Sequence, residues 1–352
     1  MRARGVVAAA VLGWLMGMPG APARAQASGA GLFDSDAPLR LRFAGDLGTL
    51  LNDRDSVTAR YHRFTLTYRI GDSAAVTVPV ELKTRGHWRR QERHCDYPPF
   101  RLDFPRSRVD GTLFSGENKL KLVTPCRPKL GDYEEYVLRE YLVYQVYNLL
   151  TPWSLRARLA STTYVDTTGR RDSLTTSTFL IEDPERMAAR NGGQLMELKG
   201  AEFSHVDSLQ LGLVGTFLYM IGATDWSLRG LHNIELAQDV AHGVFHPVAY
   251  DFDFTGIVNT AYARPDARLR IRTVRDRLYR GACLTGEHWR AVLAPFQERK
   301  ATIYALYERH PGLSPGYVRS THRYLDDFYR VIGDSARLSR EVIRRCREQE
   351  GV

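Results

Sequence analysis

The segment 221–256, which reads IGATDWSLRGLHNIELAQDVAHGVFHPVAYDFDFTG, predicts a polar loop, a β-hairpin and a second, acidic loop. In 233–237 and 244–250, β-branched and aromatic residues alternate with polar ones, as they do in half-buried strands. Asp225 precedes the hairpin and Asp251 follows it. We therefore expect the two loops to lie together at one end of a small sheet.

The polar residues of these loops match the requirements of phosphoryl transfer. A hydroxyl that attacks the γ-phosphate of ATP needs a carboxylate to orient it and to accept its proton, and Asp225 suits that role. The phosphates need Mg²⁺ or Mn²⁺ held by oxygen ligands. Asn233 and Asp251 suit this second role, with Asp253 either as a further ligand or as a residue that supports the ligands without binding the cation, while His232 is expected to hold the loop through its ring.

A purely structural interpretation of the same aspartates is also open. An aspartate in a loop after a helix, such as Asp225, is often a cap or a turn former. Asp251 and Asp253 are harder to explain in this way. They are expected on one face at the end of an apolar strand, where an unpaired carboxylate is costly without a cation or a hydrogen-bond donor.

The spacing of these residues resembles that of one family of atypical kinases. Asp225 and Asn233 lie eight residues apart, which is wider than the five-residue spacing of ordinary protein kinases. The pattern resembles the spore-coat H (CotH) family, in which an aspartate opens a longer loop ending in His-Asn or Asn-Asn and an aromatic-Asp pair follows one hairpin. The similar segments are DWS at 225–227, HN at 232–233, VAYDFD at 248–253, LKTRG at 82–86, PPFRL at 98–102 and NKLKLV at 118–123.

The resemblance implies an α+β, two-lobed fold like that of an atypical protein kinase. The β-rich N-lobe would span 26–184 and include an αC-like helix, and the mostly helical C-lobe would span 185–352 and carry the catalytic loop and the hairpin. The implied activity is transfer of the γ-phosphate of ATP to a Ser or Thr hydroxyl of a protein. Arg85, in the family's Arg-Gly segment, is implied as a phosphate contact.

A lysine and a glutamate are expected to complete the nucleotide site of such a lobe. Apolar residues at helical spacing predict a helix over 133–150, with Asp132 as its cap and Glu135 completing a capping box. Glu140 lies in the middle of this helix among apolar residues, where a carboxylate needs a partner. We therefore expect Glu140 to pair with Lys121, which would contact the nucleotide phosphates.

The remaining elements follow from the same periodicities. Strands are expected at 39–43, 63–70, 75–83, 100–104, 119–123, 158–166 and 173–181. Further helices are expected at 185–191, 206–223, 286–310, 314–333 and 335–350. This order of strands and helices agrees with the two-lobed expectation.

The first 25 residues have the layout of a secretory signal peptide. Two arginines precede a small-to-apolar run, and Ala-Arg-Ala at 23–25 is a suitable cleavage site. No later run reaches the roughly 20 apolar residues that a membrane-spanning helix needs. We therefore expect an exported protein, periplasmic or extracellular, without a transmembrane segment after cleavage.

Four cysteines are an even number in a chain expected to be exported, so disulfides are permitted. Three pairings are possible. Cys95 and Cys126 flank one region, and Cys283 and Cys346 both lie in the C-terminal helical part. We therefore predict one disulfide between Cys95 and Cys126 and another between Cys283 and Cys346.

The formal charge of +9 comes mostly from arginine. Clusters lie at 85–93 and 268–280, and the second alternates arginine with apolar residues as a strand does. Such a strand would offer a cationic face to phosphate or to an acidic substrate. No recognised nucleic-acid-binding module accompanies these clusters, and nucleic acid is not an expected partner.

Three functions remain open from the sequence alone. The first is an exported CotH-like kinase, which the presence of both Asp225 and Asp251 favours. The second is a catalytically silent, kinase-like surface or binding module, because secreted compartments hold little ATP. The third is a small-molecule phosphotransferase, which shares the order of loop, hairpin and aspartate.

Overall fold

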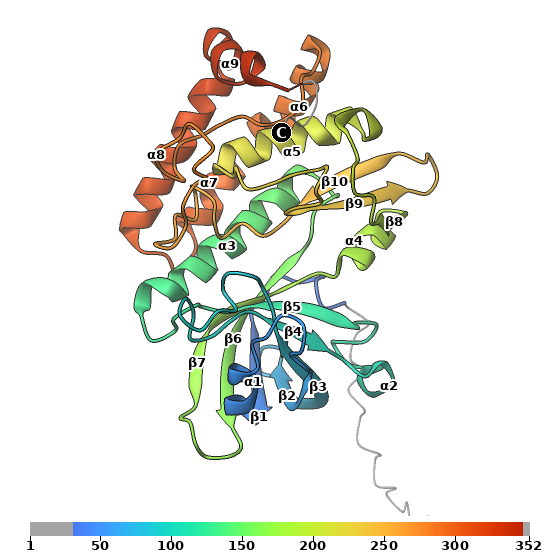
Figure 1. Ribbon diagram of the computed structural model, residues 1–352, viewed down its shortest axis with the longest axis vertical. Helices are drawn as coiled ribbons and strands as arrows, with labels where there is room; N and C mark the ends of the chain where they lie inside the picture. Colours follow the sequence, from blue (N-terminus) through green and yellow to red (C-terminus); the bar gives the residue numbers. More distant parts are fainter. Residues whose placement is uncertain (1–30, 348–352) are drawn as a thin grey trace, which may run out of the picture.

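The computed structural model describes residues 31–347, which form a β-barrel and a helical part that carries a small sheet (Figure 1). The predicted signal peptide lies outside the described residues. The strands of the barrel are β1 (Leu39–Gly45), β2 (His62–Arg69), β3 (Val76–Thr84), β4 (Phe100–Asp103), β5 (Lys119–Val123), β6 (Ala157–Asp166) and β7 (Leu174–Ile181). Two short helices, α1 (Leu47–Asn52) and α2 (Arg106–Val109), accompany these strands.

The expected two-lobed kinase-type fold is wrong, because the N-terminal strands close on themselves. Their order is β1-β2-β3-β4-β5-β7-β6, and β6 returns beside β1 in parallel pairing, from Leu39 opposite Ala160 to Gly45 opposite Asp166. The other pairs are antiparallel, so the barrel is mixed. Residue types and turn signals in the sequence predicted each strand, but such local patterns do not reveal whether the first and last strands of a sheet meet.

The barrel has a hydrophobic interior of its own. Phe43, Leu66 and Leu102, from three different strands, are fully buried there. Inward-facing apolar residues alternate with outward-facing polar ones along β1, where Arg40 and Arg42 are exposed. This alternation is what a strand with one buried face requires.

Helix α3 (Gly131–Leu150) lies between the barrel and the C-terminal helices (Figure 1). The predicted helix is confirmed, but the capping box at its start is wrong. Leu130 is the cap residue and makes no side-chain capping bond, and Glu135 accepts hydrogen bonds from Arg139 and Ser314 instead. The middle of α3 is buried on all sides, because it packs against both parts of the molecule.

Up to residue 347, the C-terminal part combines a three-stranded antiparallel sheet, in the order β10-β9-β8, with six helices and two short 3₁₀ turns. Its elements are α4 (Pro184–Arg190), β8 (Gly193–Met196), η1 (Phe203–His205), α5 (Ser208–Ile221), β9 (Ile234–Asp239), β10 (Phe245–Ala249), α6 (Gly286–Glu298), α7 (Lys300–Glu308), α8 (Pro315–Ile332), α9 (Ser335–Glu341) and η2 (Ile343–Arg345). The predicted hairpin is therefore confirmed. Strand β8 was not predicted, because its four residues are too few to show a period.

The predicted strand at 268–280 is wrong. These residues form bends and turns without a strand, and three of their arginines, Arg275, Arg277 and Arg280, bind backbone carbonyls. Arg275 donates to the carbonyl of Gly256, and Arg277 donates to the carbonyls of Met220 and Tyr324. Arg275 and Arg277 thus fasten a long irregular segment to α5, to α8 and to the loop after β10.

Both predicted disulfides are confirmed. Cys95 is bonded to Cys126, and Cys283 is bonded to Cys346. Within residues 31–347, no helix is both long and apolar enough to cross a membrane.

Candidate functional site

The first loop of the site begins where α5 ends. Gly222 adopts a left-handed conformation with φ of 71° and caps the helix, as glycine commonly does. Asp225 follows three residues later with 64% of its side chain exposed. His232 Nε2 lies 2.9 Å from Asp225 Oδ1, and Asn233 Nδ2 donates to the backbone carbonyl of Asp225 over 2.7 Å. These two bonds fix the loop by engaging Asp225 through Oδ1 and through its backbone carbonyl.

The second loop follows β10 and is tied to the first. Tyr250 N donates to the carbonyl of Asn233 over 3.1 Å, and Asp251 N donates to Tyr144 Oη over 3.0 Å. Asn233 and Asp251 both have positive φ, at 53° and 65°. Such backbone conformations are uncommon outside glycine and tend to occur at functional sites.

The expected arrangement of Asp251 and Asp253 on one face of a strand is wrong. Strand β10 ends at Ala249, and the positive φ of Asp251 breaks the alternation. Phe252 is buried against Tyr144, with ring centroids 4.7 Å apart. As a result, Asp251 is exposed and Asp253 is buried.

Five of the predicted site residues line one cavity of about 280 Å³: Arg85, Asp225, Asn233, Asp251 and Asp253. The structure thus brings together residues that lie up to 168 positions apart in the sequence, from Arg85 to Asp253. Trp88, Arg89 and Phe254 complete much of its wall.

The predicted pair of Lys121 and Glu140 does not form. Lys121 Nζ lies 3.9 Å from Glu235 Oε1 and 4.4 Å from the centre of the Tyr250 ring. Burial lowers the pKa of Lys121 to about 8. Sequence reasoning missed Glu235 because its approach to β5 depends on how the small sheet docks against the barrel.

Glu140 pairs with Arg89 instead. Arg89 Nη1 lies 4.0 Å from Glu140 Oε2 and 3.6 Å from Asp253 Oδ2, and all three side chains are buried. Arg89 Nη2 also donates to the carbonyl of Thr124. Burial and the charge of Asp253 raise the pKa of Glu140 well above its usual range. The guanidinium of Arg89 thus pairs with the carboxylates of both Glu140 and Asp253.

Asp253 belongs to this buried group more than to the open cavity. Tyr262 Oη donates to Asp253 Oδ2 over 3.0 Å. Burial and the nearby charge of Asp251 raise the pKa of Asp253 to about 6, against the opposing effect of Arg89. The carboxylate is therefore oriented by Arg89 and Tyr262, and its fit as a direct metal ligand is poorer than that of Asp251.

A divalent cation fits the cavity if a nucleotide supplies part of its coordination. Among residues 31–347, no group of three or more His, Cys, Asp or Glu side chains is arranged to hold a metal ion. Asn233 and Asp251 nevertheless both line the cavity, and the bond from Asn233 Nδ2 leaves its Oδ1 available. Mg²⁺ is commonly held by one or two carboxylates together with substrate phosphates and water.

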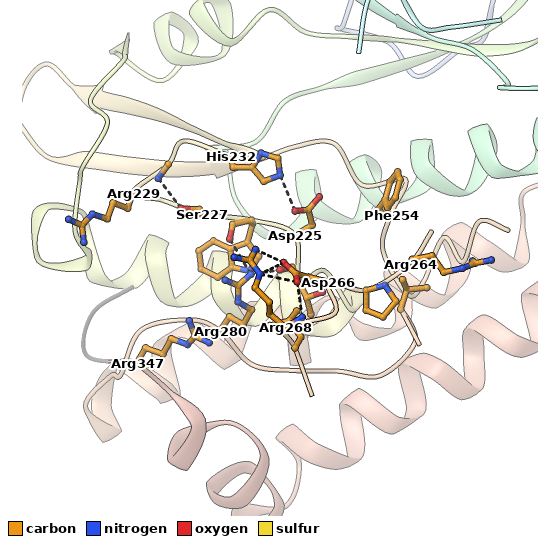
Figure 2. A pocket seen from close by; sticks show the side chains of 16 residues that line it. Asp225, Ser227, Arg229, His232, Phe254, Arg264, Asp266, Arg268, Arg280 and Arg347 are labelled. Atoms are coloured by element: carbon orange, nitrogen blue, oxygen red, sulfur yellow. Dashed lines mark hydrogen bonds and ion pairs between the residues drawn. The ribbon is translucent and has the colours of Figure 1, made fainter. Parts of the chain in front are cut away.

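A second cavity, of about 950 Å³, adjoins the first (Figure 2). The two cavities share Asp225, His232 and Phe254. Asp225 therefore faces the metal-ligand candidates on one side and a larger space on the other. The sequence had indicated neither the second cavity nor that the two cavities have lining residues in common.

Arg280 fixes the position of Asp225 through the backbone of the two neighbouring residues. Its Nη1 donates to the carbonyl of Thr224 and, over 3.3 Å, to the carbonyl of Trp226. These carbonyls stand on either side of Asp225 in the chain. The arginine-rich composition of 268–280 was the only sequence signal for this contact, and it had suggested a strand.

No known protein-family model matches this chain, and no curated protein is significantly similar to it. The geometry of the site and its chemistry therefore carry the functional argument.

Proposed function

We propose that this chain is an exported phosphotransferase that moves the γ-phosphate of ATP to a Ser or Thr hydroxyl of a protein, as the resemblance to CotH-like kinases implies. The proposal rests chiefly on the position of Asp225 at the junction of the two cavities. A nucleotide in the smaller cavity and an acceptor in the larger one would meet at this carboxylate. The two disulfides fit the proposed export.

Asp225 is the proposed general base. Its Oδ1 is bonded to His232, so Oδ2 is the atom that can accept a proton from the acceptor hydroxyl. The hydrogen bond to Asp225 raises the pKa of His232, which favours the ring as a donor to the carboxylate. Because His232 holds the carboxylate plane, the hydroxyl is oriented before it reacts.

Asn233 and Asp251 are the proposed cation ligands, and a bound Mg²⁺ or Mn²⁺ would neutralise charge on the nucleotide phosphates. Arg85 lines the same cavity and is the proposed contact of the chain with a phosphate oxygen. Arg89 holds Asp253 and Glu140, so it supports the floor of the cavity. Lys121 adds a partly buried cation on β5, within electrostatic reach of the cavity residues Arg85 and Asp251.

The direct test is to titrate the purified oxidised chain with ATP, with and without Mg²⁺, and then to follow transfer of labelled γ-phosphate to itself and to a Ser/Thr peptide library. Magnesium-dependent binding followed by transfer would support the proposal. Equal ATP affinity with and without Mg²⁺ would contradict the cation site. Binding of Mg-ATP without transfer to any acceptor would favour the silent binding module.

A further inference from the structure

The larger cavity has a lining that is strongly cationic. Among residues 31–347, five arginines line it, against two aspartates, one of which is the proposed base Asp225. The other, Asp266, is already engaged, because its Oδ2 lies 2.5 Å from Arg268 Nη2. The space next to the proposed base therefore carries an excess of positive charge.

The arginines come from separate segments and surround the cavity. Figure 2 shows Arg229 and Arg347 on one side, Arg264 on the opposite side, and Arg268 and Arg280 between them. Small-ligand sites usually place a few polar groups so that they converge on one spot. Cations spread around a cavity of about 950 Å³ are better suited to an extended ligand with several negative charges.

Three of the five arginines differ in their contacts. Arg280 is engaged with the backbone on both sides of Asp225, as described above. Arg264 and Arg268 lie on the exposed loop after β10, and 90% of the Arg268 side chain is exposed. Arg264 donates only to carbonyls of its own loop, those of Ala261 and Ala263, among the hydrogen bonds that the structure records for the described residues. These two side chains can therefore meet a ligand without loss of a long-range contact.

We propose that the larger cavity binds an acidic peptide segment and presents its Ser or Thr hydroxyl to Asp225. The phosphate-transfer part of this inference rests on the proposed function. In that step the acceptor oxygen forms a bond to the γ-phosphorus, and the bond from that phosphorus to the bridging oxygen breaks. The electron pair leaves with ADP, and the hydroxyl proton goes to Asp225 Oδ2, so the products are phosphopeptide and ADP.

The test measures peptide binding without nucleotide, so its outcome does not depend on transfer. Three labelled peptides of equal length, each with one central Ser, are compared by fluorescence anisotropy: one flanked by Glu and Asp, one by Ala and one by Lys. The acidic peptide should bind most tightly. Rising salt should weaken its binding, because salt screens the ion pairs between the peptide carboxylates and the exposed arginines.

Two sets of variants locate the contact. Arg264→Glu with Arg268→Glu should weaken binding of the acidic peptide about tenfold, as expected for loss and reversal of two exposed charge pairs. Asp266→Asn should strengthen it, because Arg268 loses its ion pair with Oδ2 of residue 266, while the hydrogen bond from Arg268 N to Oδ1 of that side chain is kept. Arg40→Glu with Arg42→Glu is the matched control, since it makes the same change in charge on exposed barrel positions.

The outcomes separate the two proposals. Equal affinity for the acidic and alanine peptides, or an equal loss in the barrel control, overturns the cavity assignment. Competition by small dicarboxylates at the same concentration as the peptide also overturns it, in favour of a small anionic acceptor. Site-dependent binding of the acidic peptide by a protein that transfers no phosphate leaves the binding site standing and overturns the proposed function.

Discussion

His232 Nε2 lies 2.9 Å from Asp225 Oδ1, across the ends of the loop that joins α5 to β9. The bond is reinforced by the amide of Asn233, which holds the carbonyl of the same aspartate. An eight-residue spacing between Asp225 and Asn233 therefore still brings both residues to one cavity. The loop is longer than that of ordinary protein kinases, and the histidine closes it.

Arg280→Lys tests whether the hydrogen bonds from Arg280 to the carbonyls on either side of Asp225 matter for transfer. Lysine keeps the charge but cannot hold the carbonyls of Thr224 and Trp226 together, so the carboxylate should be less well placed. We expect kcat for phosphate transfer to fall by on the order of 10-fold to 100-fold, with little change in Mg-ATP affinity. Single-turnover transfer and calorimetry measure the two quantities.

The matched control is Arg277→Lys, which also removes a guanidinium that binds two carbonyls, those of Met220 and Tyr324. It should reduce thermal stability without a specific loss of transfer. If both variants lose transfer in proportion to their stability, Arg280 has only a structural role.

Arg89→Met should be among the most destabilising single changes in the chain. It leaves Glu140 and Asp253 buried without their common cation, and the loss of one partner of a buried ion pair costs about 3–5 kcal/mol. Urea unfolding measures this loss. Adding Glu140→Gln should restore part of the stability, because one uncompensated carboxylate is removed.

Arg127→Met is the control for this experiment. Arg127 is partly buried and bonds the carbonyls of Arg93 and His94, but the structure records no ion pair for it among residues 31–347. A loss of stability equal to that of Arg89→Met would show that the two carboxylates are not the cause.

Glu117 should give the stability of the protein a pH dependence that is unrelated to the site. Its side chain is fully buried, with Arg186 Nη1 3.1 Å from its Oε1, and burial raises its pKa from 4.5 to about 7. The folded state therefore binds the proton more tightly than the unfolded state. The stabilisation is complete below pH 4.5 and is lost as the pH rises through about 7.

Glu117→Gln should remove this component. Unfolding free energies of the wild type and the variant, measured between pH 4.5 and 8, should differ in slope, with the wild type declining more steeply as the pH rises. Parallel curves would mean that Arg186 holds the carboxylate in its charged form throughout.

Removal of the disulfides should destabilise the protein unequally. Cys283 and Cys346 are separated by 63 residues, and Cys95 and Cys126 by 31. Loss of a disulfide typically lowers the free energy of unfolding by about 2–4 kcal/mol, and a longer closed loop restricts the unfolded chain more. The paired Ser substitutions at 283 and 346 should therefore lower the free energy of unfolding more than those at 95 and 126. Denaturant midpoints of the two double variants are the measurement, and a larger loss at 95 and 126 would contradict the loop-length argument.

Local sequence patterns predicted most individual elements but not their assembly. The helix at 133–150 was predictable from apolar residues at helical spacing, and the hairpin after Asn233 from the alternation of apolar and polar residues in its strands. The barrel was not, because the pairing of Leu39 with Ala160 joins strands more than a hundred residues apart. Closure of a sheet leaves no local pattern.

For the site too, local features could be predicted from the sequence, but contacts between distant segments could not. Asp225, Asn233 and Asp251 could be predicted, because each lies in a loop next to the hairpin and has suitable chemistry. The pairing of Lys121 with Glu235 and of Glu140 with Arg89 could not, because the first depends on how the small sheet packs against the barrel and the second on how α3 packs against the loop between β3 and β4. Mid-helix Glu140 did indicate a buried partner, but the sequence offered several cations.

The central claim, that Asp225 is the base and Asp251 a cation ligand, is tested most directly by phosphate transfer measured beside Mg-ATP affinity in two variants. Asp225→Asn keeps the shape of the side chain but removes the proton acceptor, so transfer should fall by about 10²–10⁴-fold while Mg-ATP affinity hardly changes. Asp251→Asn should weaken both, because a hard cation loses a charged ligand. Transfer by Asp225→Asn at the wild-type rate, with Mg-ATP affinity unchanged in both variants, would contradict the account.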